Sequence, residues 1–319
     1  MEQEGSVREG ESSQVIQSPT MSTQPEPNTP VCDYEGSDYQ TSFWDKGGRA
    51  YEDAAEAIAL QHLLPKSGRL MLEIGAGAGR NTPRYAGFER IVLLDYSRTQ
   101  LQQAQARLGK SEKYIYVAAD AYRLPFVDGL FDGATMIRTL HHMADAPKAL
   151  GQVARILQSD SVFILEFANK KNIKSILRWL LRRQSWSPFT REPVEFVALN
   201  FDFHPRAVFD WLASAGFTVE AKRTVSHFRL GLLKRLVPAK WLAALDGLFQ
   251  PTGEIFQFTP SVFVRAKRVG QPSSLSSDFF QCPECGQHPL ASHADHLACP
   301  SCGRIYRIRD GIYDFREPE

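Results

Sequence analysis

Apolar runs alternate with helical patterns along the first half of this chain. Short runs rich in Val, Ile, Leu and Ala predict buried strands at 70–74, 91–95, 114–118, 133–137 and 162–167. Between them, apolar residues at three- and four-residue steps predict helices at about 81–85, 99–108 and 146–157. Strands that alternate with helices at this spacing predict an α/β fold, in which a doubly wound, mostly parallel sheet has helices on both faces.

The second half adds two predicted strands and brings their number to seven. A helical pattern at 205–215 ends at Gly216 and precedes a strand at 218–222, and a last strand follows at 261–267. The segment between these strands shows no long sheet-covering helix, so we expect them to pair as an antiparallel edge.

A helical pattern with an aromatic leader precedes the first strand. Tyr39, Phe43, Trp44 and Tyr51 lead into small and apolar residues at helical spacing, and Pro65 ends the pattern. One interpretation is a helix packed on the sheet. The other is that the aromatic leader folds over the loop after the first strand as part of a lid.

Composition limits the organisation of the chain. Its 319 residues are 43% hydrophobic and 23% charged with a net charge of +1, which is typical of a soluble globular protein with one large and one smaller domain. We expect a disordered tail at 1–34, a large domain at 35–269, a linker at 270–278 and a cysteine-rich module at 279–319. No apolar run is long enough for a membrane span and no secretory signal is visible, so we expect a cytoplasmic protein, with peripheral membrane attachment left open.

The loop after the first strand has a glycine at every second position. Gly75, Gly77 and Gly79 let the backbone turn tightly and approach a ligand closely. Glu73 precedes this loop, so a pyrophosphate would be repelled and a cationic ligand favoured. The second and third strands end at Asp95 and Asp120, and the carboxyl ends of parallel strands form the ligand-binding edge of such a sheet.

These pieces resemble the class I S-adenosylmethionine-dependent methyltransferases, especially the group of ubiquinone/menaquinone methyltransferases. The matching phrases are LEIGAGAGR at 72–80, VLLDYS at 92–97, AADAYRLPFVDGLFDGATMIRTLHHMAD at 118–145 and LGQVARILQSDSVFILEF at 150–167. The resemblance implies a Rossmann-like sheet that binds S-adenosylmethionine. The family usually has Pro-Gly-Gly before the fifth strand, where this chain has Gln158-Ser159-Asp160.

The resemblance also implies roles for individual residues. Glu73 would lie near the cofactor's ammonium group, and the loop of Gly75, Ala76, Gly77 and Gly79 would surround its methionine part. Asp95 would hold the ribose, Tyr96 would lie against the adenine, and Asp120 with Ala121 would recognise the adenine edge.

No catalytic residue is assigned, because an activated methyl group needs positioning more than a nucleophile. His141 and His142 follow the fourth strand, where a base could act, but a structural role is the other interpretation. The fourth strand is not followed by an Asn/Asp-Pro-Pro-Tyr motif, which counts against methylation of amide or exocyclic base nitrogens.

Two basic amphipathic segments lie after the fifth predicted strand and after the strand predicted at 218–222. Segments 170–191 and 222–240 contain 13 of the 37 Lys and Arg residues and no acidic residue. They fall in the regions expected as lids, at about 168–204 and 223–258. Three interpretations remain open: a lid with solvated charges, attachment to an anionic membrane surface, and phosphate contacts with RNA.

The C-terminal module has the pattern of a metal site. Cys282, Cys285, Cys299 and Cys302 form two C-x-x-C pairs separated by 13 residues, a spacing typical of a structural Zn²⁺ site with four sulfur ligands. A disulfide or redox role is the alternative, and Cys32, the fifth cysteine, is expected to have no role.

The same module resembles the small zinc-ribbon activators of methyltransferases that modify tRNA, rRNA and translation factors. The phrases are CPECGQHPL, LACPSCGRIYRIRDGIYDF and, within the latter, the ending from Tyr306 to Ile312. We therefore expect the ribbon to dock on its own catalytic domain. The function expected for the whole chain is methyl transfer to a small-molecule or lipid-like acceptor, and the alternative is an RNA or a translation factor with the ribbon as an activator in cis.

Overall fold

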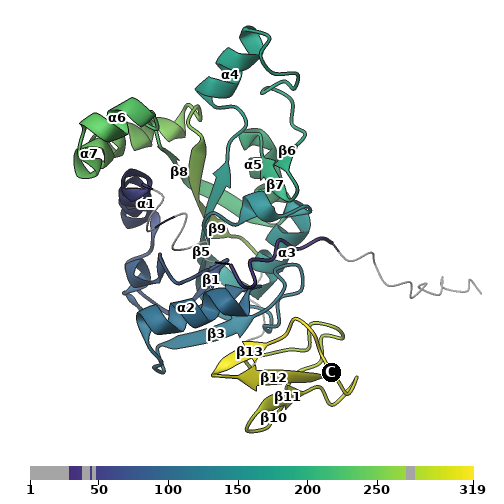
Figure 1. Cartoon of the computed structure of the whole chain (residues 1–319). Helices are drawn as coiled ribbons and strands as arrows, with labels where there is room; N and C mark the ends of the chain where they lie inside the picture. The colour runs from purple at the N-terminus through teal and green to yellow at the C-terminus, as the bar shows by residue number, and fades with distance from the viewer. Residues whose placement is uncertain (1–28, 38–43, 45–47, 271–276) are drawn as a thin grey trace, which may run out of the picture.

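One long sheet runs through the protein (Figure 1). The computed structural model describes residues 29–37, 44, 48–270 and 277–319. The strand order is β10-β11-β12-β13-β3-β2-β1-β4-β5-β9-β8. Seven of these strands are those expected from the sequence: β1 (Gly68–Ile74), β2 (Phe88–Asp95), β3 (Tyr114–Ala118), β4 (Phe131–Met136), β5 (Leu157–Ala168), β8 (Phe217–Val225) and β9 (Ser261–Arg268). The prediction of an α/β fold with a mostly parallel sheet is confirmed.

Strand β1 lies at the centre because both faces of its apolar run are buried. Leu72 pairs with Val92 of β2 on one side and with Ala134 of β4 on the other, and all three pairs of strands from β3 to β4 are parallel. Leu72 and Met71 belong to cores on opposite faces of the sheet, as the two-residue period of a strand requires. The carboxyl ends of β1, β2, β3 and β4 therefore meet at one edge.

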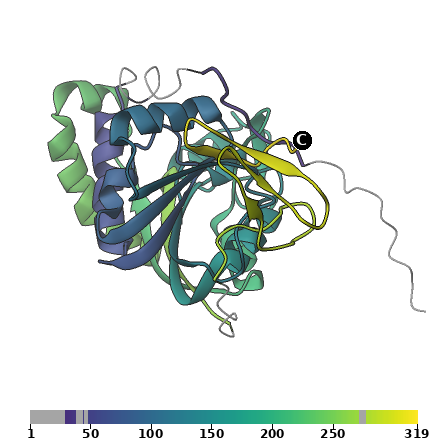
Figure 2. The same ribbon diagram turned by 90° about the horizontal axis from the view of Figure 1, so that it is seen from below.

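Helices cover both faces of the sheet, as the view from below shows (Figure 2). The helices that follow the parallel strands are η2 (Thr82–Tyr85), α2 (Arg98–Leu108), η3 (Leu140–His142), α3 (Ala146–Ile156) and α5 (Pro205–Ser214). Ser97 and Asp145 cap two of them, because their side-chain oxygens accept hydrogen bonds from the backbone amides of Gln100 and Lys148. Four of these helices begin and end within two residues of the predicted positions; the short η3 was not predicted.

Helix α1 (Ala50–Leu63) packs on the sheet. Tyr51, Ala55 and Ala59 are buried with Ile164 of β5 and Phe263 of β9 in one core cluster. The sheet-packed interpretation of this segment is confirmed. Of its aromatic leader, Tyr39 and Phe43 lie outside the described residues, as do residues 1–28 of the expected tail and 271–276 of the expected linker.

The antiparallel edge is also confirmed. β9 pairs antiparallel with β5 and with β8, so the last strand of the large domain is inserted between two earlier ones. The segment between β8 and β9 contains α6 (Gly231–Leu236), α7 (Ala239–Phe249) and η4 (Gln250–Glu254). These helices pack beside α1 and do not form a parallel crossover.

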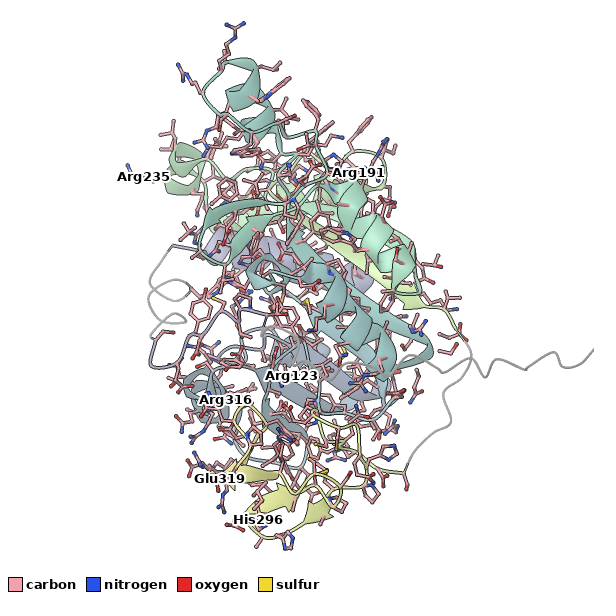
Figure 3. The ribbon with its side chains drawn as sticks, turned by 90° about the vertical axis from the view of Figure 1, so that its right-hand side faces the viewer. Arg123, Arg191, Arg235, His296, Arg316 and Glu319 are labelled. Atoms are coloured by element: carbon pink, nitrogen blue, oxygen red, sulfur yellow. The ribbon has the colours of Figure 1, made fainter. Side chains whose placement is uncertain are left out.

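A second insertion follows β5. It contains α4 (Ile173–Leu180) and a separate two-stranded hairpin of β6 (Val194–Val197) and β7 (Asn200–Asp202). Together with α6 and α7 it forms the end of the molecule opposite the ribbon, where Figure 3 labels Arg191 and Arg235, with His296 and Glu319 at the other end. Among the described helices, none has the length and apolar character that crossing a bilayer requires.

The C-terminal ribbon extends the sheet. Its strands are β10 (Ala291–Ser292), β11 (His296–Ala298), β12 (Ile305–Arg309) and β13 (Ile312–Asp314). β13 pairs in parallel with β3, with Tyr313 opposite Val117. The expected count of seven strands was therefore too low for the whole sheet, which has eleven strands in the described part, because the ribbon adds its strands to the free edge of β3.

Aromatic packing fastens the ribbon beside that edge. Phe280 stacks on Phe126 of the large domain, with ring centroids 5.8 Å apart, and Phe279 meets the same ring edge-on at 6.0 Å. Phe126 is fully buried, so the contact removes a large apolar surface from water. The expected docking of the ribbon on its own catalytic domain is confirmed.

Candidate cofactor and metal sites

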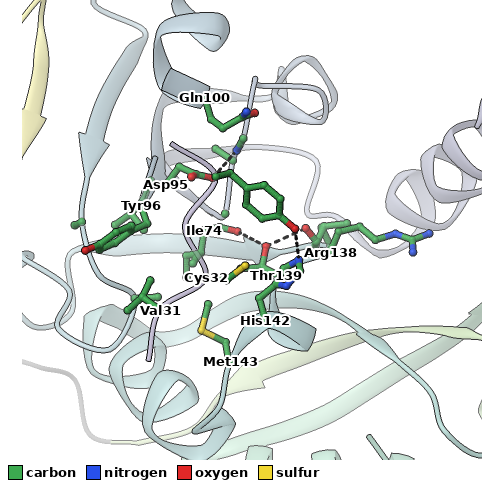
Figure 4. Close-up of a pocket in the computed structure, with 18 of the residues that line it drawn as sticks. Val31, Cys32, Ile74, Asp95, Tyr96, Gln100, Arg138, Thr139, His142 and Met143 are labelled. Carbon is green, nitrogen blue, oxygen red and sulfur yellow. Dashed lines mark hydrogen bonds between the residues drawn. The ribbon is translucent and has the colours of Figure 1, made fainter. Parts of the chain in front are cut away.

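A cavity opens at the carboxyl ends of the central strands (Figure 4). Its wall includes residues from the loops after β1, β2, β3 and β4 and from the segment before α1. The predicted site residues on this wall are Gly75, Ala76, Gly77, Asp95, Tyr96, Asp120 and Ala121. The fold thus brings together seven of the nine residues predicted to bind a cofactor.

The glycine loop is tied to the end of β2. The backbone amides of Gly75 and Ala76 both donate to the carbonyl of Leu94, at 2.8 and 3.0 Å. Gly75 has a φ of +68°, and a Cβ added there would fall on the Thr139 side chain. Gly77 has a φ of +53° with no described atom closer than Gln100 Oε1 at 3.8 Å to its Cβ position, so this turn faces open space in the cavity. The two glycines are therefore needed for different reasons. A side chain at Gly75 would collide with Thr139, whereas Gly77 provides a backbone conformation with positive φ next to the open cavity.

Asp95 connects this loop to helix α2. Its Oδ2 accepts a hydrogen bond from the Gly77 amide at 2.8 Å, and its Oδ1 accepts one from the Ser97 amide at 2.9 Å. Burial raises the pKa of this carboxyl group to about 6, although both hydrogen bonds oppose the shift. Each oxygen keeps a lone pair, so the carboxylate can still accept hydrogen bonds from a ligand in the cavity.

Asp120 stands on the neighbouring loop. Its Oδ1 accepts a hydrogen bond from the Tyr122 amide at 2.8 Å, and this turn places Ala121 on the cavity wall. Tyr96 contributes an aromatic ring to the same wall. The wall therefore offers a ring face and a short acidic side chain within one recess.

Glu73 and Gly79 are the two predicted residues that do not line the cavity among the described residues. Glu73 shares a sheet face with Met71, where Thr82 Oγ1 donates to its carboxylate at 2.6 Å and the Tyr85 hydroxyl lies 3.5 Å away. Burial raises the pKa of Glu73 to about 7. The alternation of side chains along β1 directs Glu73 beneath the loop, where it orders η2.

Sequence reasoning missed a buried ion cluster beside the cavity. Glu56 of α1 is fully buried and pairs with Arg80 at 2.8 Å and with Arg138 Nε at 2.8 Å. Burial opposes ionisation, but the two guanidinium groups hold the pKa of Glu56 below its ordinary value. Both arginines line the cavity, and Arg80 also lies 3.5 Å from the centre of the Trp44 ring. The position of Arg80 directly after the glycine loop was the one signal in the sequence.

The interpretation of the aromatic leader as part of a lid over the glycine loop has partial support. Trp44 lines the cavity and covers Arg80, so one described residue of the aromatic leader does lie against the glycine loop. Cys32 and Tyr34 line the cavity as well, although the sequence assigned no role to Cys32.

His142 lines the cavity, and its ring is fixed by two hydrogen bonds. Its Nδ1 donates to the carbonyl of Leu199 at 3.0 Å, which leaves Nε2 to accept from the Tyr34 hydroxyl at 3.1 Å. Burial lowers the pKa of His142, and burial with the adjacent His142 lowers that of His141 well below its ordinary value. Both rings are therefore neutral at pH 7, and its two hydrogen bonds favour the structural interpretation of His142.

The four predicted metal ligands converge in the ribbon. The sulfur atoms of Cys282, Cys285, Cys299 and Cys302 all lie within 4.8 Å of one another. Two of the sulfur pairs are 3.7 Å apart (Cys282 and Cys302) and 3.5 Å apart (Cys285 and Cys299). Zinc–sulfur bonds of about 2.3 Å in a tetrahedron put the sulfurs about 3.8 Å apart, so this donor set fits Zn²⁺. Both knuckles close in the same way, since Gly286 and Gly303 donate to the carbonyls of Cys282 and Cys299.

The ribbon also touches the cofactor cavity. Arg316 Nη1 donates to the carbonyl of Tyr96 at 3.2 Å and pairs with Glu35 at 3.1 Å, and its guanidinium lies 5.7 Å from the Tyr96 ring. Glu35 in turn accepts from the amide of Arg98 at 2.9 Å, at the start of α2. The C-terminal residues thus support the part of the wall that comes from β2.

The strand order, the glycine loop and the strand-end carboxylates Asp95 and Asp120 define a methyltransferase-type fold with its cavity at the carboxyl ends of the strands. Residues 72–165 match the methyltransferase domain family, and residues 277–311 match the Trm112p-like protein family. The chain therefore combines a methyltransferase-family domain with a C-terminal Trm112p-like domain.

Curated relatives match the first of these domains. An O-methyltransferase, cnsE, of Penicillium expansum is 28% identical over 147 residues, which are 42% of this chain and 52% of the relative. The ubiquinone/menaquinone biosynthesis C-methyltransferase UbiE of Paracoccus denitrificans is 28% identical over 132 residues, which are 39% of this chain and 52% of the relative. The chain spans about half the length of the curated relatives it matches.

Solved structures share the fold at low identity. A putative S-adenosylmethionine-dependent methyltransferase from Listeria monocytogenes superposes with a TM-score of 0.51 at 16% identity, covering 69% of this chain and 99% of that one. A chain from the complex between the Haloferax volcanii Trm112 methyltransferase activator and a putative methyltransferase gives 0.50 at 16% identity, covering 73% of this chain and 96% of that one.

Proposed function

We propose that this chain is an S-adenosylmethionine-dependent methyltransferase that acts on a small-molecule or lipid-like acceptor. The observation that supports this most directly is the Asp95 carboxylate, which lies on the wall of the cavity and fixes the glycine loop through Gly77. The match of residues 72–165 to the methyltransferase domain family supports the same assignment. One relative named above is an O-methyltransferase and the other is a ubiquinone/menaquinone biosynthesis C-methyltransferase, and the second favours a small-molecule or lipid-like acceptor.

The residues of the cavity suit the parts of this cofactor. The Gly75–Gly77 turn leaves room for a methionine chain, Asp95 can accept hydrogen bonds from ribose hydroxyls, and Tyr96 offers a ring face for adenine. Asp120 is placed to accept a hydrogen bond from an exocyclic amine. The bound cofactor supplies an activated methyl group on a sulfonium. The protein's own contribution is to hold both reactants in place and to exclude water.

The alternative acceptor is an RNA or a translation factor. It is supported by the match of residues 277–311 to the Trm112p-like family, with the ribbon as an activator in cis. Basic segments 170–191 and 222–240 would then contact RNA phosphates, whereas with a lipid-like acceptor they would contact an anionic membrane surface. We also propose that the four cysteines bind a structural Zn²⁺, since sulfur occupies all four ligand positions.

Two measurements test this function. Calorimetric titration with S-adenosylhomocysteine should show one site per chain, and its absence in the zinc-loaded protein would contradict the proposal. Incubation with methyl-tritiated S-adenosylmethionine and a whole-cell extract, followed by separation into lipid, RNA and protein fractions, identifies the acceptor class. Label in the lipid or small-molecule fraction supports the main proposal, and label in RNA or protein supports the alternative.

A further inference from the structure

The exposed apolar residues of this protein gather at one end of the molecule. Among the described residues, 18 large apolar side chains are exposed, and all except Val269 lie between Ile173 and Phe256. They belong to α4, the β6–β7 hairpin, α6, α7 and the adjoining loops, including the one after η4; Figure 1 places α4, α6 and α7 away from the ribbon. An exposed apolar surface of this extent on a soluble domain marks a contact site.

The exposed residues form regular stripes on two helical segments. On α4 and the residue after it, Ile173, Leu177, Leu180 and Leu181 are 53–63% exposed and recur at three- and four-residue steps. On α7, Trp241, Leu245 and Leu248 recur in the same way, while Leu242 and Ala243 on the opposite face pack against α1. In both segments an apolar face is turned outwards. The chain covers neither face with another described element.

The same end of the molecule carries cations without acidic partners. Lys174 and Arg178 lie on α4, Arg182 and Arg183 follow it, Arg235 lies in the last turn of α6, and Lys240 lies in the first turn of α7. None of these six takes part in an ion pair among the described residues. By contrast, Lys222, Arg223, Arg229 and Lys234, the cations nearer the sheet, are paired with Glu52 or Glu254. The surface is therefore apolar and positively charged at once.

A second cavity opens within this surface. It has a volume of about 820 Å³, and its wall includes the exposed residues Ile173, Phe196, Leu230 and Phe256. Deeper in the same wall, Ser226 is 1% exposed and its hydroxyl has no hydrogen-bond partner among the described residues. A buried hydroxyl without a partner is costly unless a water or a ligand satisfies it.

The β6–β7 hairpin stands between this cavity and the cofactor cavity. Asp202 of β7 lines the second cavity, and Leu199, in the turn of the hairpin, accepts the hydrogen bond from His142 of the first. Arg138 lines the first cavity and Arg229 the second, and burial together with the charge of Arg138 lowers the pKa of Arg229. The two cavities are neighbours.

We propose that the surface made by α4, the β6–β7 hairpin, α6, α7 and η4 docks on an anionic lipid bilayer, and that the second cavity receives the acceptor from that lipid phase. Eleven of its 17 exposed apolar side chains are aliphatic, which suits acyl chains better than the base stacking that single-stranded RNA requires. Unpaired Lys and Arg beside them suit anionic headgroups. Docking itself does not depend on the methyltransferase activity; delivery of the acceptor rests on the proposed function.

Vesicle sedimentation tests the docking. The full-length, zinc-loaded protein is mixed with vesicles of 3:1 phosphatidylcholine and phosphatidylglycerol or of phosphatidylcholine alone. We expect partitioning at least tenfold stronger on the anionic vesicles and several-fold weaker when NaCl rises from 0.05 to 0.5 M. Equal partitioning on both vesicles, or none, would overturn the proposal.

Matched variants locate the contact. Leu177→Glu with Leu180→Glu, and separately Arg178→Glu with Arg183→Glu, should reduce partitioning at least tenfold. The controls are Val269→Glu, an exposed apolar residue outside the surface, and Lys110→Glu, an exposed cation on the loop after α2; both should bind like the wild type. All four variants should bind S-adenosylhomocysteine with unchanged affinity, so a loss of docking is separate from a loss of the cofactor site.

Two other occupants would contradict the proposal. If light scattering shows a dimer that the Leu177→Glu, Leu180→Glu variant dissociates, the surface contacts a second copy of the chain. If a 20-nucleotide RNA binds with salt-dependent affinity, the same variants lose RNA binding, and vesicles do not bind, the surface contacts RNA.

Delivery of the acceptor from the lipid phase has its own test. Formation of a tritiated methyl product should require vesicles, and the yield of that product should decrease in the Leu177→Glu, Leu180→Glu variant.

Discussion

Asp95 Oδ2 accepts a hydrogen bond from the Gly77 amide across 2.8 Å, and this contact joins the ends of β1 and β2 at the cofactor cavity. The two residues are 18 positions apart in sequence and meet because their strands are adjacent and parallel. The same carboxylate receives the Ser97 amide at the start of α2. One side chain therefore sets the position of the glycine loop and of the helix beside the cavity.

Replacing Asp95 should impair cofactor binding. Asp95→Ala removes the proposed ribose acceptor and the hydrogen bond from the Gly77 amide. We therefore expect the affinity for S-adenosylhomocysteine to fall at least tenfold, about 1.4 kcal/mol, by calorimetry. Glu89→Ala is the control, because Glu89 is an exposed residue near the other end of the same strand. Equal affinity of the two variants would remove Asp95 from the site.

Replacing Gly75 should cost more stability than replacing another glycine with positive φ. Gly75→Ala strains the backbone and forces a Cβ onto Thr139, whereas Gly109→Ala, with a φ of +83°, meets no described atom within 4 Å. We expect urea denaturation to show a loss of about 1 kcal/mol for Gly109→Ala from conformation alone and a clearly larger loss for Gly75→Ala. Similar losses would mean that Thr139 moves aside freely.

The buried Glu73 should make stability depend on pH. Burial raises its pKa from 4.5 to about 7, so the folded state binds the proton more tightly than the unfolded state. Its contribution to the free energy of unfolding is full below about pH 4.5 and is lost as the pH rises through 7. Relative to Glu73→Gln, the wild type should lose on the order of 1 to 3 kcal/mol between pH 4.5 and pH 8.

The control for this measurement is Glu112→Gln, since Glu112 is exposed. Its stability difference from the wild type should stay constant over the same pH range in urea denaturation followed by circular dichroism. If the stability difference between Glu73→Gln and the wild type is also constant with pH, folding does not raise the pKa of Glu73.

The ribbon should need its metal to fold. Elemental analysis should find one zinc per chain, and Cys282→Ser should abolish it, because Cys282 is a fully buried member of the four-sulfur cluster. Cys32→Ser should retain the zinc, since Cys32 lies at the cofactor cavity. A Cys282→Ser protein that keeps full zinc content would disprove the assignment.

Arg316 should link the ribbon to cofactor affinity. Arg316→Ala removes the contacts with the Tyr96 carbonyl and Glu35, so we expect S-adenosylhomocysteine to bind several-fold more weakly while zinc content stays unchanged. Arg309→Ala is the control, because Arg309 is an exposed ribbon residue that pairs only with Glu319 among the described residues.

Deletion of residues 279–319 should lower the stability, the solubility and the affinity for S-adenosylhomocysteine together. If the deletion has no effect on these three properties, the docking of the ribbon is not a functional contact.

Local sequence patterns were sufficient where the side chains themselves set the structure. The alternation of apolar runs and helical periods predicted the strands and their order of succession, because the runs of central strands such as β1 and β4 are buried on both faces of the sheet. The two C-x-x-C pairs predicted the sulfur cluster, since their short knuckles fix the ligands locally. Asp95 and Asp120 could be predicted as cavity residues because the carboxyl ends of parallel strands lie at one edge of the sheet.

Other features depended on which segments meet in space. The alternation along β1 turned Glu73 away from the cavity towards Thr82. The pairing of Glu56 with Arg80 and Arg138 required α1 to pack on the sheet next to η2. No local pattern relates Arg316 to Tyr96 or Leu199 to His142, because these contacts join segments more than 50 residues apart.

The sequence by itself determined the α/β class, the glycine loop and the four-cysteine cluster, because these follow from periodicity, glycine conformation and cysteine spacing within short segments. Only the tertiary structure decided that the ribbon continues the sheet through β3 and that the apolar and basic insertions leave one end of the molecule uncovered. The physical reason is that strand pairing and burial are set by the whole chain, since the same apolar stripe on α4 could have been covered by another element.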